Sequence, residues 1–170
     1  MLKWIGAGLV AALSLYIGLS LGAAERRRAE ELRAFCRFLG SAEESIGTLR
    51  LPAEEIFLAY ADGLLERNGF LPRLRAQVRR KGCGDALGAV IREMAKENRL
   101  ALRDGDAAEL LAFSAAFGTG DSTQEVRRCA YYRAHLMRLA EEAEAEAPGN
   151  VRIFRVLSVS AGILCILLLF

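Results

Sequence analysis

The chain has 170 residues, of which 53% are hydrophobic and only 8% aromatic, and its formal net charge is +2 at pH 7. So small a charge, with basic residues interspersed among acids, argues against a nucleic-acid-binding patch. The four cysteines stand singly, without a CxxC motif or a Cys/His cluster, so neither a zinc site nor a redox pair is indicated. Abundant Ala, Leu, Glu and Arg with only three prolines predict an all-α protein.

An apolar segment stands near each end of the chain, at residues 4–24 and 156–170. At about 1.5 Å per residue, a helix of the first length crosses a hydrocarbon core of about 30 Å. The sequence therefore predicts transmembrane helices over residues 1–24 and 151–170, with a helical domain over residues 25–150 between them. The second apolar segment is the shorter of the two and reaches a full span only if its flanking arginines extend to the headgroups.

Basic residues flank both segments on the side that faces the middle of the chain. They are Arg26, Arg27 and Arg28 after the first segment, and Arg152 and Arg155 before the second. Because such residues are retained on the cytoplasmic side, the central domain is predicted to be cytoplasmic, in a cell-membrane protein with two spans.

The N-terminal segment also has features of a secretory signal peptide. Met1-Leu2-Lys3 resembles a short basic region, and Gly22-Ala23-Ala24 offers small residues for cleavage. In that case the protein is an exported helical binding domain with a C-terminal membrane anchor. The length of the apolar run and the arginines directly after it favour the anchor interpretation.

The central domain is predicted to be an antiparallel bundle of about six helices. The first covers residues 25–50, continues from the N-terminal span and carries an apolar stripe at spacings of three and four. The second begins at Pro52 and ends at Asn68-Gly69. Pro72 opens the third, which Gly82 and Gly84 stop, and Asp85 caps the fourth.

The last two helices flank a glycine-rich loop, Gly118-Thr119-Gly120. The fifth follows Asp104-Gly105-Asp106 and ends at that loop. The sixth opens with Ser122-Thr123-Gln124-Glu125, a capping box in which the serine accepts from a free amide and the glutamate reaches back. It ends, after an acidic stretch, at Pro148-Gly149.

No catalytic or metal-binding set is visible in the sequence, so we expect no enzyme activity, no cofactor and no metal. The single histidine, His135, has no Cys or Ser at helical spacing. Gly118-Thr119-Gly120 lacks the Lys-Ser/Thr of a phosphate loop. Asp104, Asp106 and Asp121 lack the spacing of a calcium loop and are interpreted as caps and turn residues.

Over its whole length the chain resembles the stage III sporulation protein AB family of endospore-forming bacteria. Four features carry the resemblance: the opening Met1-Leu2-Lys3, the stretch from Ile46 to Pro52, the stretch Phe117-Gly118-Thr119-Gly120-Asp121 followed by Gln124, and a closing Arg155-Val156-Leu157 that leads through Gly162 into a Leu/Ile tail. The stretch from Gly118 to Gln124 is the most specific. The chain departs from the family pattern at Thr48 and Ala53, where an aromatic residue and a leucine are expected.

The resemblance implies a non-enzymatic role. The family is similar to the cytoplasmic helical domain of the type II secretion F protein, a membrane platform. The implied partners are a secretion-type ATPase and other membrane subunits of a channel complex between mother cell and forespore, with the central domain on the mother-cell side. Gly118, Gly120, Asp121 and Gln124 are the expected partner-binding residues.

Overall fold

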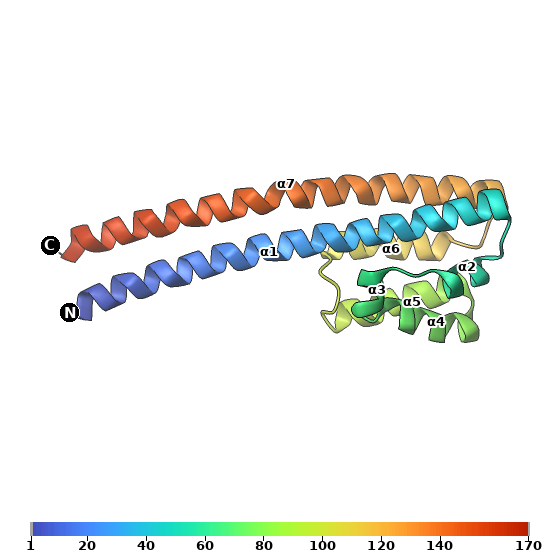
Figure 1. Cartoon of the computed structure of the whole chain (residues 1–170), viewed down its shortest axis with the longest axis horizontal. Helices are drawn as coiled ribbons and strands as arrows, with labels where there is room; N and C mark the ends of the chain where they lie inside the picture. Colours follow the sequence, from blue (N-terminus) through green and yellow to red (C-terminus); the bar gives the residue numbers. More distant parts are fainter. Residues whose placement is uncertain (1, 170) are drawn as a thin grey trace. The chain divides into compact units, whose positions relative to one another are not determined.

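All regular secondary structure in the part of the chain that the structure describes is helical. This computed structural model describes the backbone of residues 2–169 and the side chains of residues 23–80 and 82–146, with those of Tyr16 and Ser20. Seven α-helices and one π-helical turn occur in that range, and no strand does (Figure 1). The all-α prediction is therefore confirmed.

The elements follow one another along the chain with short connections. They are α1 (Leu2–Glu44), the π-helical turn η1 (Ser45–Leu49), α2 (Ala53–Ala59), α3 (Gly63–Arg67), α4 (Phe70–Lys81), α5 (Cys83–Lys96), α6 (Asp104–Ala116) and α7 (Ser122–Leu169). The chain separates into two compact units: one combines the residues up to Arg27 with those from Glu142 onward, and the other is Arg28–Glu141. This second unit, hereafter the helical unit, contains the buried core.

Helix α1 runs without a break from Leu2 to Glu44, so the predicted continuity between the N-terminal segment and the first helix of the domain is confirmed. Its apolar stripe is buried in the helical unit, with Leu32, Phe35 and Leu39 each at most 1% exposed. The helix widens into η1, which ends at Arg50 in a left-handed conformation with φ of 51°. The backbone N–H of Leu51 donates to the carbonyl of Ser45 at 3.2 Å and closes the turn.

The predicted second helix is in fact two helices, α2 and α3. Pro52 precedes α2 as expected. The break after Tyr60 arises because the Asp62 carboxylate accepts from the backbone N–H groups of Leu64 and Leu65, at 2.9 and 3.1 Å, and so caps α3. The prediction of one helix was wrong because the apolar period continues through this cap.

The next three helices lie close to their predicted positions. Helices α4 and α5 each begin two residues early, which leaves Pro72 and Asp85 inside the first turn, where the free N–H groups tolerate proline and favour an acid. Gly82, with φ of 81°, separates the two helices. Helix α6 begins at Asp104, so Asp104-Gly105-Asp106 form its first turn and do not precede it as predicted.

Helix α7 begins at Ser122, but its cap is one residue earlier than predicted. The Asp121 carboxylate accepts from the backbone N–H of Gln124 at 2.7 Å, and the Glu125 carboxylate accepts from that of Gly120 at 2.9 Å. The helix then continues to Leu169. The predicted end at Pro148-Gly149 was wrong, because a proline within a long helix removes one hydrogen bond and does not always end it.

Aromatic side chains hold the helical unit together. Phe35 of α1 meets Phe70 of α4 edge to face, with ring centroids 4.9 Å apart, and Phe38 of α1 meets Phe57 of α2 at 5.0 Å. Phe57 also stacks on Phe117, which follows α6, at 5.2 Å. Beyond the apolar area that they bury, such pairs contribute about 0.5–1.5 kcal/mol each.

Within the helical unit, α7 covers one side of α1, while α2 to α5 lie on the other (Figure 1). Gly40 of α1 and Gly47 of η1 both lie at ordinary contact distance from side chains of α7. A Cβ atom at Gly40 would lie 3.5 Å from Arg133, and one at Gly47 would lie 3.4 Å from Val126. The thiol of Cys36 donates to the carbonyl of Arg133 at 3.6 Å.

A buried ion pair joins α1 to the start of α6. The guanidinium of Arg28 donates to both carboxylate oxygens of Asp106, at 2.7 and 2.8 Å, and the two side chains are 6% and 2% exposed. Asp106 also accepts from the backbone N–H of Arg103 at 2.9 Å. One turn along α1, the buried Glu31 accepts from the backbone N–H of Ala101 at 2.7 Å. Both contacts fix α1 against the connection between α5 and α6.

No helix among the residues with described side chains is long and apolar enough to cross a membrane. The two predicted spans, residues 1–24 and 151–170, lie almost wholly outside those residues.

Candidate docking cleft

The glycine-rich loop singled out in the sequence is held by an ordered set of hydrogen bonds. Gly118 has a φ of 82°, which residues with a side chain rarely adopt. The Thr119 hydroxyl donates to the carbonyl of Ala116 at 2.7 Å. Arg128 of α7 also donates to that carbonyl, and to the Glu125 carboxylate at 2.5 Å. Since α6 ends here, these donors satisfy carbonyls that the helix leaves open.

Beside this loop lies a cleft of about 440 Å³. Three segments line it: the start of α2 at Ala53, the start of α5 from Gly82 to Asp85, and the end of α6 with its loop, from Ser114 to Thr119. We call it the docking cleft.

Close backbone packing shapes the floor of the docking cleft. A Cβ atom at Gly84 would lie 2.7 Å from the carbonyl oxygen of Ser114 and 2.9 Å from that of Phe117. Only glycine lets α5 approach the end of α6 so closely, because both obstructing atoms belong to the backbone. The second glycine after α4, interpreted from sequence as a helix stop, is therefore a packing residue inside α5.

Apolar and acidic residues lie close in sequence to the residues that line the cleft. Leu51 stands two residues before Ala53 and is 36% exposed, and Leu49 is 62% exposed. The carboxylates of Glu54, Glu55 and Asp85 are exposed, and none of them forms an ion pair with the part of the chain that the structure describes. Exposed leucines beside a cleft are typical of protein-binding surfaces.

Cys83 is a half-buried thiol on the wall of the cleft. Burial raises the pKa of this thiol, and the negative charge of Glu54 raises it further. The reactive thiolate is therefore scarce at neutral pH, and the environment does not suit a nucleophile. Among the described residues, no group of three His, Cys, Asp or Glu side chains could hold a metal ion.

The predicted site residues fall into two sets. Gly118 lines the cleft, whereas Gly120, Asp121 and Gln124 build the turn into α7. A Cβ atom at Gly120 would lie 2.7 Å from the side-chain oxygen of Gln124, which can move away, and 3.0 Å from the Cβ atom of Gln124, so the turn leaves little room for a side chain there. The motif thus sets the conformation of the loop, and the cleft lies next to it.

Sequence reasoning missed the contributions of Ala53, Cys83 and Ser114 to this surface. Each comes from a different element, so no local spacing connects them. The sequence singled out Ala53 only as a position where the family resemblance leads us to expect a leucine.

His135, the only histidine, lies outside the cleft. Its Nε2 atom is 3.6 Å from the Glu109 carboxylate and its Nδ1 atom is 3.5 Å from Arg138. These are the contacts of a partly exposed residue between charged neighbours.

Comparison with known proteins gives one match. The family model for stage III sporulation protein AB matches residues 3–170. No curated protein sequence and no solved structure matches the chain.

Proposed function

We propose, since this chain belongs to the stage III sporulation protein AB family, that it is a non-enzymatic membrane scaffold of a sporulation channel. Family membership assigns the protein to sporulation. The scaffold role, the secretion-type ATPase partner and the location are our proposals. In this proposal, spans at residues 1–24 and 151–170 hold the domain at the cytoplasmic, mother-cell side of the membrane, and the flanking arginines support that orientation.

The observation that carries the proposal is the docking cleft beside the loop from Gly118 to Gln124. The most specific stretch of the family pattern shapes the edge of an open hollow of about 440 Å³, and the segment that leads into its wall at Ala53 carries two exposed leucines, Leu49 and Leu51. A hollow with apolar flanks accepts a projecting side chain of a protein, which then becomes a central anchor of the interface. Helices on three sides make the cleft a rigid acceptor.

The charge at the cleft indicates which charge the bound segment of the partner carries. Asp85 lines the cleft, and Glu54 and Glu55 lie in the first turn of α2, which begins at its wall. Unpaired carboxylates steer and retain a basic partner. We therefore expect the ATPase to present a basic segment with an apolar anchor at this cleft.

The experiment is co-purification of a secretion-type ATPase with the full chain from co-expressing membranes. Ala53→Trp fills the mouth of the cleft and should lower ATPase recovery at least about tenfold, the effect of losing one anchor. Ala76→Trp, at an exposed alanine on α4, is the matched control and should leave recovery unchanged. Equal recovery with both variants would place the interface elsewhere.

A second measurement uses the thiol in the cleft wall. Alkylation of Cys83 in the native protein should slow when the ATPase is bound, because the partner covers the cleft. Cys36 and Cys129 are buried and serve as internal references. An unchanged Cys83 rate in a complex that demonstrably forms would exclude the cleft as its contact site.

A further inference from the structure

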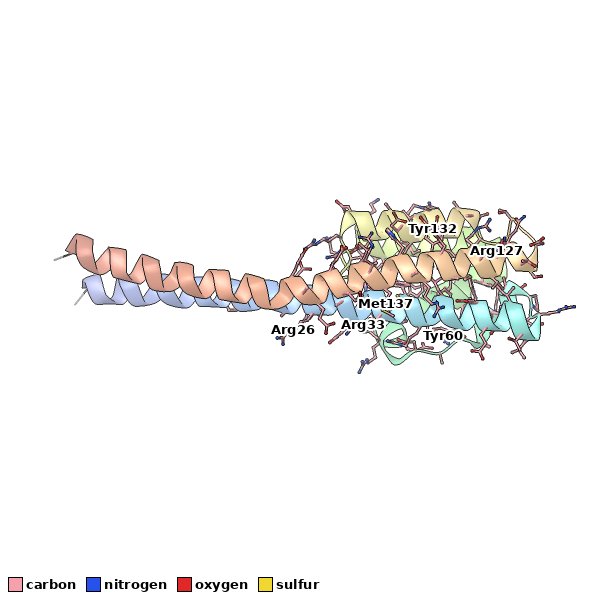
Figure 2. All side chains as sticks on the ribbon, turned by 90° about the horizontal axis from the view of Figure 1, so that it is seen from above. Arg26, Arg33, Tyr60, Arg127, Tyr132 and Met137 are labelled. Atoms are coloured by element: carbon pink, nitrogen blue, oxygen red, sulfur yellow. The ribbon has the colours of Figure 1, made fainter. Side chains whose placement is uncertain are left out.

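Two hollows flank the exposed side of α1 within the helical unit. One, of about 350 Å³, lies against α3, and the other, of about 290 Å³, lies against α7. Arg33 and Arg37 line both, so the hollows form one surface that crosses α1. Figure 2 labels Arg33 and Met137 where α1 and α7 lie side by side. We call this surface the arginine groove.

Positive charge predominates in the arginine groove. Four arginines line it, Arg33, Arg37, Arg67 and Arg133, against two carboxylates, Glu30 and Asp62. At least one of these positive charges is not neutralised by an ion pair in the described part of the chain. Exposed Arg67 forms neither a hydrogen bond nor an ion pair with the described residues.

Arg37 and Arg133 have partners and still face solvent. Arg37 holds the Asp62 carboxylate through Nε and Nη2, at 2.9 and 2.7 Å, while its side chain is 56% exposed. Arg133 lies 3.1 Å from the Glu43 carboxylate and is 47% exposed. A guanidinium group has five N–H donors, so each of these side chains can donate to a further acceptor.

The hollow against α7 also has apolar surface. Cys36 is buried at its base, Gly40 adds no side chain, and Met137 is 41% exposed. Methionine adapts its shape to different apolar partners. This side of the groove can therefore receive an aliphatic side chain between the arginines.

We propose that the arginine groove binds an acidic segment of a protein partner, one in which carboxylates alternate with aliphatic side chains. Guanidinium groups match carboxylates in geometry and charge, as Arg37 already does with Asp62. The guanidinium groups line hollows on both sides of a helix, where an extended or helical segment reaches them and a flat lipid surface does not. The groove shares no lining residue with the docking cleft, so it is a second interaction surface, of opposite charge.

The test measures binding of the full chain in detergent to a short synthetic peptide of glutamate, leucine and alanine. The same peptide with glutamine in place of glutamate is the ligand control. The double variant Arg33→Gln with Arg67→Gln should raise Kd about tenfold, through the loss of charge-assisted contacts. Arg79→Gln with Arg80→Gln removes the same charge from exposed positions on α4 and should change Kd less than about twofold, if binding is local. Equal losses in the two double variants would show non-specific attraction and overturn the proposal.

A further pair of variants, which leaves the charge unchanged, tests whether a loss of binding comes from misfolding. Met137→Ala should weaken binding of the acidic peptide, whereas Tyr131→Ala, which removes a 66% exposed side chain on the same helix outside the groove, should not. Circular dichroism should give the same helix content for all variants. A parallel experiment measures binding of the same variants to vesicles that contain an anionic phospholipid. If the Arg33/Arg67 variant loses vesicle binding and keeps peptide binding, the groove recognises lipid and the proposal is wrong.

Discussion

At the scale of single residues, the helical unit depends on buried charges that have defined partners. Arg28 and Asp106 are 78 positions apart in sequence and almost fully buried together. The pair orients α1 relative to α6, while its net contribution to stability is small because burial desolvates both charges. Removal of one partner alone should destabilise the fold, since the charge of the other side chain then stays buried.

Asp106→Asn should therefore lower the free energy of unfolding by about 3–5 kcal/mol, because it leaves the Arg28 charge without its carboxylate. Urea denaturation followed by circular dichroism measures the change. The double variant Arg28→Met with Asp106→Leu should cost less than Asp106→Asn alone, since it buries no charge. A larger loss in the double variant would contradict this account.

Glu31 should make stability depend on pH. Burial raises the pKa of its carboxyl group above the ordinary 4.5, although the hydrogen bond from the Ala101 backbone and the nearby Asn68 side chain lower it in part. Below pH 4.5 the group is protonated in both folded and unfolded chains. As pH rises from there through the raised pKa, the folded chain holds more protons than the unfolded one, so stability falls.

Glu31→Gln resembles the protonated form and can still accept from the Ala101 backbone. The difference in unfolding free energy between this variant and the original chain should grow in the variant's favour as pH rises above 4.5, then become constant above the raised pKa. Denaturation over a pH series measures it. A difference that shrinks with rising pH would refute the assignment.

At the scale of elements, the contact of α5 with the end of α6 requires glycine. Gly84→Ala should lower the unfolding free energy by about 1–3 kcal/mol, because its Cβ atom meets two backbone carbonyls that cannot rotate away. Gly105→Ala is the matched control: it lies in α6 with no heavy atom within 4 Å of the added Cβ, and should stabilise by up to about 1 kcal/mol. Thermal denaturation of both variants measures these changes in stability. Equal effects would mean that the α5–α6 contact is loose.

The helix boundaries also show which local sequence signals suffice to predict where an element begins or ends. Pro52, Gly82 and the loop at Gly118 punctuate the chain where the structure does, since proline and glycine act through the local backbone. Asp62 was missed because a capping side chain competes with an apolar period that continues through it. The docking cleft could not be predicted either. Ala53, Cys83 and Ser114 meet only after three helices pack, and only its border, Gly118, carried a local signal.

At the scale of the whole molecule, the proposed anchoring in a membrane would decide which partners the two charged surfaces can meet. Cys36 and Cys129 are buried, and burial raises their pKa values to about 11 and about 12. They resist thiol reagents in the folded protein on either side of a membrane. Among the three cysteines with described side chains, Cys83 alone is half-exposed and able to report topology.

If the domain is cytoplasmic, as we propose, a membrane-impermeant thiol reagent should leave Cys83 unlabelled in intact cells and label it after gentle lysis that keeps the protein folded. Cys83→Ser provides the background. Labelling in intact cells would place the domain outside the cytoplasm and would favour the exported, C-terminally anchored alternative. Full denaturation, which exposes Cys36 and Cys129, verifies that reagent was in excess.

The order of synthesis gives the contact between α1 and α7 a further significance. Cys36 lies against Arg133, a residue made 97 positions later, and α7 is the last element of the helical unit. Because α1 emerges from the ribosome first, α2 to α6 are the first elements that can pack against it. One side of α1 therefore stays exposed until α7 emerges. A translational pause after α6 would hold the nascent chain in this half-covered state, open to chaperones.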